Sequence, residues 1–577
     1  MIPQVIIIYQ QKEWHFEKPL EVIVASRIEE IVPSLRNVQQ RVEQGKYAVG
    51  WVTYESGPAF DSAFPQQKLS IPDLPFVWFG IFDEPTQHLL SPCRNKVEKP
   101  PIEWQPQVSK EEYKKVIEDI HKNISYGNVY QVNYTFSFHS NWNNNLISLF
   151  YHLCFAQGEG YFVYIQTDNY TILSISPELF FHYKNGKITL KPMKGTRPRG
   201  RWNIENKNNF YELQNDPKDR AENLMIVDLL RNDVGKIANL GSVEVPELFT
   251  CEPYRTVWQM TSTIKAKTDK SWVDVIQALF PSGSVTGAPK IYAMKLIQQY
   301  EPFPRGIYCG TVGWITPQNE AVFNVAIRTL LYHHKSQTAR YYVGSGIVWD
   351  SDPDKEWEEC ITKGAILNKF PSYFELIETM RVENGEIFLL DYHLRRLQES
   401  ADRFLFPVSI PQLKEKLLNY VNTVTDTLYR MKLSISPDGK FFIEHNSSIG
   451  PVKLRVGLAK NPINSQNLFL YHKTSYRTIY EQARQERLDC DDVLLWNEKR
   501  YVTESTIANI IVQFGDRMFT PPIHCGLLPG TFRQYLLDTH QIEEREISIE
   551  ELYKADAMYL VNSVRKWIEI VLVETKL

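Results

Sequence analysis

The chain has 577 residues, of which 43% are hydrophobic and 23% charged, and its formal net charge at pH 7 is −4. This length exceeds one ordinary hydrophobic core, so we expect at least two large domains. The small net charge excludes a general electrostatic attraction to nucleic acid or to an anionic membrane.

The seven cysteines are scattered and form no Cys-x-x-Cys pair. This pattern argues against a disulfide framework or a zinc site and favours a reducing compartment. The N-terminal stretch MIPQVIIIYQQKEW has no basic start, and its apolar run is too short for a signal or membrane segment. We therefore expect a soluble, cytoplasmic protein.

The first half alternates strand patterns with amphipathic helix patterns. Short strands broken by Pro-rich turns are predicted over residues 1–100, and helical spacing of apolar residues predicts a helix over 111–124. The runs YTILSISPELFFHY and GKITLKPMKG are predicted to be two strands of a hairpin that turns at Lys184–Gly186. Further helices are predicted over 220–238 and after the Gly-rich turn at 281–289, and further strands over 308–315, 321–333 and 340–349.

A domain junction is predicted at about 369–373, where the helix that begins at residue 353 ends in KFPSY. After it the pattern restarts with a strand, the turn ENGE, a second strand and the helix YHLRRLQESADRFLF. Both halves mix α and β elements. The sequence therefore predicts a multidomain α+β protein with domains over 1–368 and 372–577.

Three carboxylates of the first half are candidate metal ligands. Glu356 and Glu359 stand three residues apart on a predicted helix and share one face, and Glu222 lies near the start of another helix. Carboxylates that converge from two helices can hold Mg²⁺, which prefers oxygen ligands. Helical glutamates are more often solvated, so the spacing alone leaves both interpretations open.

Three further stretches are ambiguous by pattern alone. SGSVTGAPK is not a nucleotide P-loop, because Lys290 follows proline, but its backbone N–H groups suit a carboxylate. Arg328 lies on a predicted strand and faces either inward, where it needs an anion, or outward. Lys194, in KPMKGTRPRG, is an ordinary surface lysine as readily as a special one.

Six motifs between residues 176 and 363 together resemble the chorismate-utilising enzymes, which include anthranilate synthase, isochorismate synthase and component I of aminodeoxychorismate synthase. The resemblance covers about residues 1–368 and implies a two-lobed α/β sandwich of antiparallel sheets. In chain order, the motifs are SPELF, KPMKGTRPRG, DRAENLMIVDLLRNDVG, PSGSVTGAPK, GTVGWI and GSGIVWDSDPDKEWEECITK.

The resemblance also implies roles for individual residues. Glu178 matches a general acid at the leaving hydroxyl of chorismate, and Glu222, Glu356 and Glu359 match ligands of Mg²⁺. The substrate is expected to be held by side chains and backbone of Tyr308, Arg328, Thr286, Lys363, Gly344 and Gly346.

Lys194 distinguishes between members of that family. Anthranilate and isochorismate enzymes carry alanine there, whereas aminodeoxychorismate synthases typically carry lysine. A buried lysine has a lowered pKa and can act as a nucleophile. Attack at ring C2 with loss of the C4 hydroxyl opens C4 to ammonia, so the resemblance implies amination at C4.

Two departures accompany this resemblance. Gln259 stands where relatives carry histidine and cannot titrate, so any proton transfer there must come from Glu178 or water. No Gly-x-Cys-x-Gly glutaminase motif occurs in the chain. Ammonia must therefore come from a separate glutaminase subunit or from free ammonium.

Four motifs of the second half together resemble the fold-type IV pyridoxal phosphate enzymes, which include branched-chain and D-amino acid aminotransferases and aminodeoxychorismate lyase. They are DYHLRRLQESA, YHKTSYR, VTESTIANIIV and LLPGTFRQYLL. Each motif alone is more often an ordinary structural feature, such as a turn carboxylate, a helix cap or a surface lysine. The pattern of YHKTSYR predicts that Lys473 ends an aromatic strand. The resemblance implies that Lys473 carries pyridoxal phosphate, that Glu504 keeps the pyridine nitrogen protonated, and that Arg396, Thr531 and Phe532 bind the phosphate.

The second resemblance covers about 372–577 but lacks the strand pair with which that family usually begins. The first domain or a second chain is expected to fill the gap, which leaves open a homodimer through this half. Because a lyase would consume the first domain's product, the two halves together imply a fused synthase and lyase that makes 4-aminobenzoate, a folate precursor. Two alternatives remain: an anthranilate-type synthase fused to an aminotransferase, and a non-catalytic sensor of chorismate or tryptophan.

Overall fold

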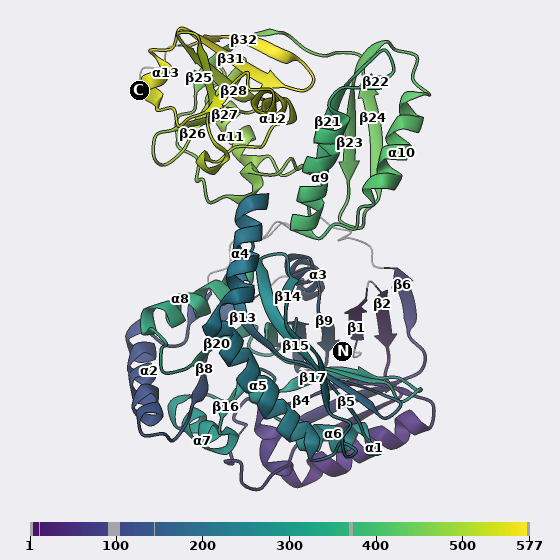
Figure 1. Cartoon of the computed structure of the whole chain (residues 1–577). Helices are drawn as coiled ribbons and strands as arrows, with labels where there is room; N and C mark the ends of the chain where they lie inside the picture. The colour runs from purple at the N-terminus through teal and green to yellow at the C-terminus, as the bar shows by residue number, and fades with distance from the viewer. Residues whose placement is uncertain are drawn as a thin grey trace. The chain divides into compact units, whose positions relative to one another are not determined.

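The structure is a computed structural model that describes residues 4–10, 12–67, 69–89, 104–142, 145–367 and 373–573. The chain, traced by colour in Figure 1, divides into two compact units. The first consists of Met1–Pro198 and Asn209–Ser372, and the second of Arg199–Asn208 and Tyr373–Leu577. A short segment of the first half thus belongs to the second unit. The junction predicted at 369–373 lies, except for its last residue, outside the described residues.

The first unit is built on two antiparallel sheets, as predicted. One has the strand order β16-β8-β20-β19-β10-β9-β1-β2-β6, with β7 beside β8. Its strands are β1 (Gln4–Tyr9), β2 (Lys12–Glu17), β6 (Thr86–Leu89), β7 (Gln105–Pro106), β8 (Gln131–Asn141), β9 (Tyr161–Gln166), β10 (Tyr170–Ser176), β16 (Gly287–Ala288), β19 (Thr329–His333) and β20 (Thr338–Ile347).

The other sheet has the order β13-β15-β12-β11-β18-β17-β4-β5-β3, with β14 beside β15. Apolar side chains of both sheets fill a shared core, to which β8 contributes Val132 and β11 contributes Phe181. Its strands are β3 (Glu21–Ala25), β4 (Tyr47–Val52), β5 (Val77–Phe82), β11 (Leu179–Lys184), β12 (Lys187–Lys191), β13 (Met193–Pro198), β14 (Glu244–Pro253), β15 (Val257–Lys267), β17 (Thr311–Ile315) and β18 (Ala321–Val325).

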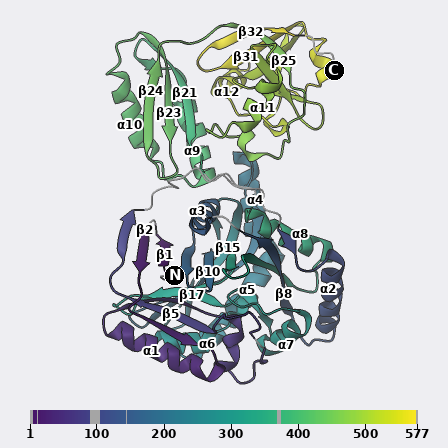
Figure 2. The same cartoon turned by 180° about the vertical axis from the view of Figure 1, so that it is seen from behind.

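Helices flank these sheets, and the helix over Asn203–Asn215 begins in the segment that belongs to the second unit. The long helix α5 packs on β13 and β15 of the second sheet (Figure 1), and α2 and α8 lie side by side (Figure 2). The helices are α1 (Ile31–Glu43), α2 (Lys110–Ser125), α3 (Leu146–Gln157), α4 (Asn203–Asn215), α5 (Pro217–Gly235), α6 (Trp272–Leu279), α7 (Lys290–Tyr300) and α8 (Pro353–Gly364), with short 3₁₀ turns η1 (Ile28–Glu30), η2 (Tyr54–Ala59), η3 (Gly283–Val285) and η4 (Ala365–Leu367).

The first hundred residues contain a helix that the prediction of strands alone missed. Helix α1 buries Ile31, Leu35, Val38 and Val42, which recur at helical spacing. That spacing is an amphipathic helix signal and was present in the sequence.

Two runs predicted as single strands are each split between the two sheets. The run 170–183 ends β10 at Ser176 and resumes as β11 at Leu179 in the other sheet. The run 321–333 breaks between β18 and β19, where Arg328 has φ 49° and is in neither strand. The hairpin predicted at Lys184–Gly186 is confirmed, since β11 pairs with β12 there, but GKITLKPMKG divides into β12 and β13.

A buried ion pair joins the end of α7 to the first sheet. Arg305, 1% exposed, donates through Nε and Nη2 to Glu301 at 2.8 and 2.7 Å. Its Nη2 also donates to the Asn133 carbonyl, and its Nη1 to the Val285 carbonyl. Glu301 in turn accepts from the backbone and hydroxyl of Thr135. This network ties β8 and the turn η3 to one point.

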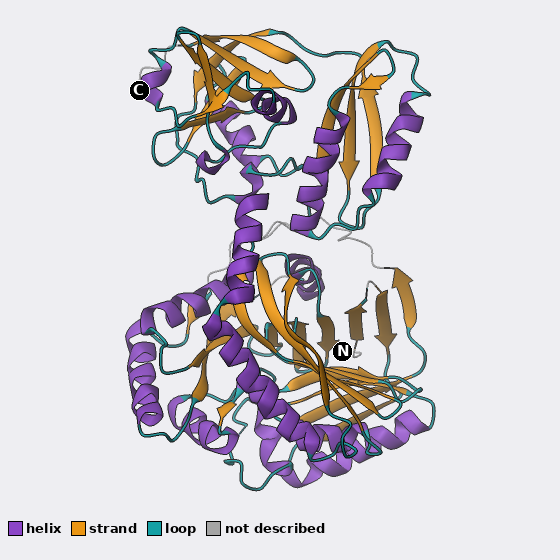
Figure 3. Cartoon of the chain, viewed as in Figure 1, coloured by secondary structure: helices purple, strands orange, loops and turns teal. Residues whose placement is uncertain are grey.

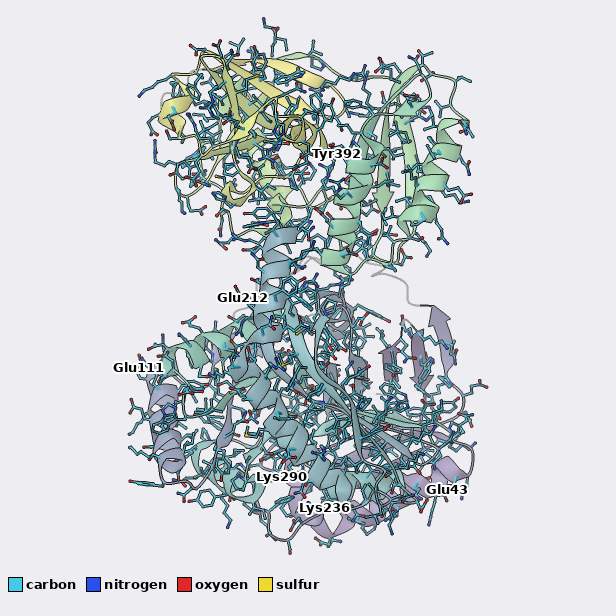
Figure 4. All side chains as sticks on the ribbon, in the orientation of Figure 1. Glu43, Glu111, Glu212, Lys236, Lys290 and Tyr392 are labelled. Atoms are coloured by element: carbon cyan, nitrogen blue, oxygen red, sulfur yellow. The ribbon has the colours of Figure 1, made fainter. Side chains whose placement is uncertain are left out.

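Lys290 of the SGSVTGAPK turn has a structural partner. Its Nζ donates to Asp233 at 2.6 Å, and Lys236 donates to the other oxygen of the same carboxylate at 2.8 Å. Figure 4 labels both lysines. The pairs hold the start of α7 to the end of α5, which accounts for Lys290 without a bound phosphate.

The second unit contains a four-stranded sheet, β22-β21-β23-β24, and an eight-stranded sheet, β27-β26-β25-β32-β31-β28-β29-β30. Helices α9 and α10 accompany the smaller sheet (Figure 3). The smaller sheet's strands are β21 (Leu376–Glu383), β22 (Glu386–Ile387), β23 (Leu428–Ile435) and β24 (Phe441–Asn446), and the larger sheet's are β25 (Lys453–Leu458), β26 (Asp492–Trp496), β27 (Val502–Ser505), β28 (Asn509–Phe514), β29 (Arg517–Thr520), β30 (Glu543–Glu544), β31 (Ala557–Asn562) and β32 (Lys566–Leu572).

The helices of this unit carry or adjoin the residues singled out in the sequence. Lys473 follows the turn η5 and does not end an aromatic strand, so that expectation was wrong. The helices are α9 (Leu390–Phe404), α10 (Ile410–Val421), α11 (Thr478–Glu486), α12 (Thr531–Asp538) and α13 (Ile549–Leu552), with the turns η5 (Leu468–Leu470) and η6 (Ile523–Cys525). Across the described ranges, no helix is both long and apolar enough to span a membrane.

The Arg305–Glu301 pair yields a stability prediction. Arg305→Met leaves a buried carboxylate without its cation, so we expect the unfolding free energy of the first unit to fall by about 3–5 kcal/mol. Arg27→Met is the control, because Arg27 pairs with Glu30 at the surface and its loss should cost at most about 1 kcal/mol. Urea unfolding followed by tryptophan fluorescence measures both. Equal losses in the two variants would contradict the structural role given to the buried pair.

Candidate active sites

Lys194 lies on β13 among groups of both charges. Burial lowers its pKa below that of a free lysine, and the carboxylates of Glu222 and Glu178 act against this shift. The Lys363 ammonium adds to the lowering. The structure therefore brings the predicted nucleophile and the predicted acid into one electrostatic neighbourhood.

Glu178 lies directly before β11 and is almost fully buried, 4% exposed. Ser284, in the turn η3, donates its hydroxyl to Glu178 Oε1 at 2.6 Å. Burial raises the pKa of Glu178 to about 7, with the Ser284 hydrogen bond and Lys194 opposing the rise. A carboxyl group with this pKa is protonated in part near neutrality, as a general acid must be.

The three predicted metal ligands come from the two helices expected. Glu222 is on α5, and Glu356 and Glu359 are on α8. Burial raises the pKa of Glu222, while Lys194 opposes this shift. Lys363 holds Glu359 in an ion pair at 2.6 Å and lowers the pKa of that carboxyl group.

These carboxylates do not form a closed coordination sphere. Among the described residues, the only three metal-ligating side chains with ligand atoms within 4.8 Å of one another are His524, Cys525 and Glu546 in the second unit. Their His524–Glu546 ion pair is exposed. The glutamates of the first unit fit Mg²⁺ by chemistry, because carboxylate oxygens are its preferred ligands, and an ammonium group now neutralises one of them.

Two of the predicted substrate-holding residues, Tyr308 and Thr286, are buried. The others are partly exposed: Arg328, Lys363, Gly344 and Gly346. Tyr308 stacks on Tyr342 with ring centroids 5.3 Å apart, and burial raises its pKa far above the usual value. Arg328 donates to the Gln157 side chain, and burial lowers its pKa. Thr286, fully buried after η3, donates to the Ser282 carbonyl at 3.1 Å.

The backbone around Gly344 and Gly346 adjoins the same site. Lys363 donates to the Gly344 carbonyl at 2.8 Å. A methyl group on Gly346 would lie 3.1 Å from Lys194 Nζ. Gln259 donates to the Gly195 carbonyl and accepts from Thr196, both at 2.9 Å. It therefore holds the strand that carries Lys194.

The second unit has a cavity of about 420 Å³ lined by the residues predicted for the cofactor. Lys473, Arg396, Glu504 and Thr531 all contribute to its walls, whereas Phe532 does not. Burial lowers the pKa of Lys473 to about 8, and the Arg396 guanidinium adds to the effect. The amine of Lys473 is thus more easily deprotonated than that of an exposed lysine.

Glu504 lies on β27 and is 4% exposed. It accepts hydrogen bonds from the Tyr480 hydroxyl at 2.8 Å, the Leu528 backbone N–H at 3.1 Å and the Asn509 amide at 3.2 Å. Burial raises its pKa to about 7, and the Tyr480 hydrogen bond opposes this. A cationic ring nitrogen placed here would stabilise the ionised carboxylate.

Arg396 is fixed by a carboxylate that sequence reasoning missed. Glu378 on β21 accepts from Arg396 Nε and Nη2 at 2.9 and 2.6 Å, and His393 lies 2.6 Å from the same carboxylate. Although burial opposes the shift, Arg396 and His393 lower the pKa of Glu378 to about 2. The Nη1 group of Arg396 donates to the carbonyl of Pro529, which lies just before the start of α12.

Helix α12 begins at Thr531, directly after the N-cap Gly530. A methyl group on Gly530 would lie 1.9 Å from the Asn509 side chain, so glycine is required for this close approach. Tyr392, labelled in Figure 4, donates to Asp538 at 2.9 Å and holds α9 to α12. Free N–H groups at this helix start, with Arg396 near, suit a phosphate.

Other residues of the two sites were not predicted. In the first, Ser284 and Gln157 bind Glu178 and Arg328. In the second, Glu378 and Tyr480 bind Arg396 and Glu504. Ser284 lies within one of the quoted motifs, and Tyr480 lies shortly after another. No local sequence pattern shows which side chains these two residues will contact.

Two protein families match this chain, one in its first half and one in its second half. The family model described as chorismate binding enzyme matches residues 3–369, and that of amino-transferase class IV matches residues 375–573. Anthranilate synthase component I from Streptococcus pneumoniae has a similar fold, with a TM-score of 0.52 at 22% identity over 63% of this chain and 89% of that chain.

Two curated relatives match within the first half. Anthranilate synthase component 1 of Aquifex aeolicus is 37% identical over 279 residues, which are 48% of this chain and 56% of that protein. Aminodeoxychorismate synthase component 1 of Escherichia coli is 37% identical over 263 residues, 45% of this chain and 58% of that protein. The chain thus spans somewhat over half the length of these relatives. It belongs to the chorismate binding enzyme family, with an amino-transferase class IV domain as its second half.

Proposed function

We propose that this chain makes 4-aminobenzoate from chorismate in two steps. The first unit would aminate chorismate at C4, and the second would remove pyruvate from the product. The observation that carries this proposal is Lys194, a partly buried lysine with a lowered pKa that interacts electrostatically with Glu178 in a chorismate binding domain. An anthranilate synthase component and an aminodeoxychorismate synthase component are each 37% identical to this chain, so overall identity does not distinguish the two reactions. Lys194 is the residue on which we base the choice of amination at C4.

In the first step, Lys194 attacks ring C2 with its lone pair, and both conjugated double bonds of the ring shift as the C4 hydroxyl leaves. Glu178 donates the proton that converts this hydroxyl into water. Ammonia then adds at C4, both double bonds shift back, and the C2–N bond to Lys194 breaks to release the lysine. The new ammonium group returns a proton to Glu178. The lowered pKa of Lys194 favours its free amine and the raised pKa of Glu178 favours its protonated form, which is the direction that this order needs.

Mg²⁺ is the metal proposed for the first site. Glu222, Glu356 and Glu359 would hold it, and it would supply positive charge for the ring carboxylate of chorismate. Tyr308 and Arg328 are proposed to hold the other carboxylate. Ammonia is proposed to come from a separate glutaminase subunit.

In the second step, pyridoxal phosphate supplies an electron sink when bound. Lys473 is proposed to hold it and then to move a proton, for which its pKa of about 8 is suited. Glu504 would pair with the ring nitrogen, while Arg396 and the backbone of Thr531 and Phe532 would bind the phosphate. We place the reaction in the cytoplasm.

Replacement of Lys194 tests the route. In Lys194→Ala, amination at C4 should fall to background, because no adduct can form at C2. Residual turnover should place nitrogen or water at C2. Lys187→Ala is the control, because Lys187 is an exposed lysine on β12, the strand that precedes β13 in the chain. Mass analysis of the products made from chorismate, ammonium and Mg²⁺ measures this. If Lys194→Ala forms aminodeoxychorismate at the parental rate, Lys194 is not the nucleophile.

The metal is tested by Glu359→Ala. We expect loss of chorismate turnover with full retention of pyruvate release from supplied aminodeoxychorismate, because only the first site uses this carboxylate. Glu358→Ala, an exposed neighbour on α8, should keep both activities. Excess chelator should reproduce the Glu359→Ala result, with recovery on added Mg²⁺. Undiminished turnover of chorismate by the parent protein in excess chelator would refute the proposed requirement for Mg²⁺.

The second unit is tested by Lys473→Ala. The purified variant should lose pyridoxal phosphate absorbance, consume chorismate at the parental rate and accumulate aminodeoxychorismate. Lys460→Ala, an exposed loop lysine, should behave like the parent. Absorbance spectra and product chromatography measure this. Formation of 4-aminobenzoate by Lys473→Ala without added lyase would exclude the role of this lysine.

A further inference from the structure

Gln131 is a fully buried side chain that the proposed mechanism does not use. It is the first residue of β8 and is 0% exposed. Within the described ranges of the chain, neither its Nε2 nor its Oε1 has a hydrogen-bond partner. Buried polar groups are nearly always paired, so each exception needs a physical reason, such as a ligand, a water molecule or a role in a site.

The neighbours of Gln131 on the same face of β8 are all paired. Side chains alternate between the two faces of a strand, so Gln131, Asn133, Thr135 and Ser137 form one row. Asn133 donates to the Ser284 carbonyl at 2.9 Å, Thr135 donates to Glu301 at 2.9 Å, and Ser137 lies 2.7 Å from His139. In the described chain, Gln131 is the one member of this row without a partner.

Gly346 shows where the Gln131 amide lies. A methyl group built on Gly346 would lie 2.2 Å from Gln131 Nε2, 3.0 Å from Asn133 Oδ1 and 3.1 Å from Lys194 Nζ. Three polar atoms therefore surround one point, and one of them is the amine proposed to attack the substrate. Glycine at this position leaves the space that any other residue would fill.

The same cluster connects to the proposed acid. Ser284 accepts from Asn133 through its carbonyl and donates to Glu178 through its hydroxyl. Gln131 thus belongs to the polar cluster that contains Lys194 and Glu178, and its carboxamide makes no hydrogen bond within the described part of the chain. This arrangement favours a ligand over a purely structural role.

We propose that Gln131 is a substrate-binding residue of the first site. The inference rests on the proposed function, which places an oxygen-rich ring beside Lys194. A carboxamide offers two N–H donors and a carbonyl acceptor. It can therefore pair with ring substituents that accept and donate, such as the ether oxygen and the hydroxyl of chorismate. A site that hydrogen-bonds these groups discriminates against rings that lack them.

The variant Gln131→Met tests this, because it keeps the length of the side chain and removes both hydrogen-bonding ends. Titration calorimetry with chorismate and Mg²⁺, without ammonium, should show a dissociation constant raised about tenfold. Thermal unfolding of the first unit should be unchanged or shifted upward, because the exchange removes a partnerless buried amide. Weaker binding without lost stability is the signature of a ligand-binding group.

Thr135→Val is the matched control from the same row. It removes a hydrogen bond that is already made, so we expect a lower thermal midpoint and an unchanged dissociation constant. If Gln131→Met instead lowers the midpoint as Thr135→Val does and binds chorismate like the parent, the side chain is structural or holds a water, and the inference fails alone. If the parent binds no chorismate, the proposed function fails and this inference fails with it.

Discussion

The first unit depends on one buried charge pair, Arg305–Glu301, which joins the end of α7 and the nearby turn η3 to β8, a strand distant in sequence. Through it, the end of α7 holds both β8 and the turn η3. Isolated charges are costly to bury, so this pair is stable only with all its hydrogen bonds made. The turn η3 carries Ser284, whose hydroxyl donates to Glu178. The position of the proposed acid therefore follows from a charge pair that does not contact it.

Burial tunes the two proposed sites in the same physical way. Removing a group from water disfavours its charged form, which lowers the pKa of a lysine and raises that of a glutamate. The first site has such a pair in Lys194 and Glu178, and the second has one in Lys473 and Glu504. Each site thus offers a lysine that can lose its proton beside a carboxyl group that can keep one near neutral pH.

In the second unit, a carboxylate again fixes a cation. Glu378 engages Arg396 with both oxygens and orients it toward the segment that precedes α12. The segment Arg199–Asn208, which the chorismate binding family model includes, belongs to this unit. The second unit therefore incorporates a piece of the first half of the chain.

The sequence by itself determined the family, because long motifs in one order carry it, and it placed Lys194 and Lys473 within those motifs. Periodicity also located α2 and α5, since a helix is a local pattern. Only the tertiary structure decided which sheet each strand joins and that Arg328 lies between two of them. Only it showed that the Gln131 carboxamide has no hydrogen-bond partner among the described residues. Strand pairing and hydrogen bonding join residues far apart in the chain, and no local pattern records which residues will meet.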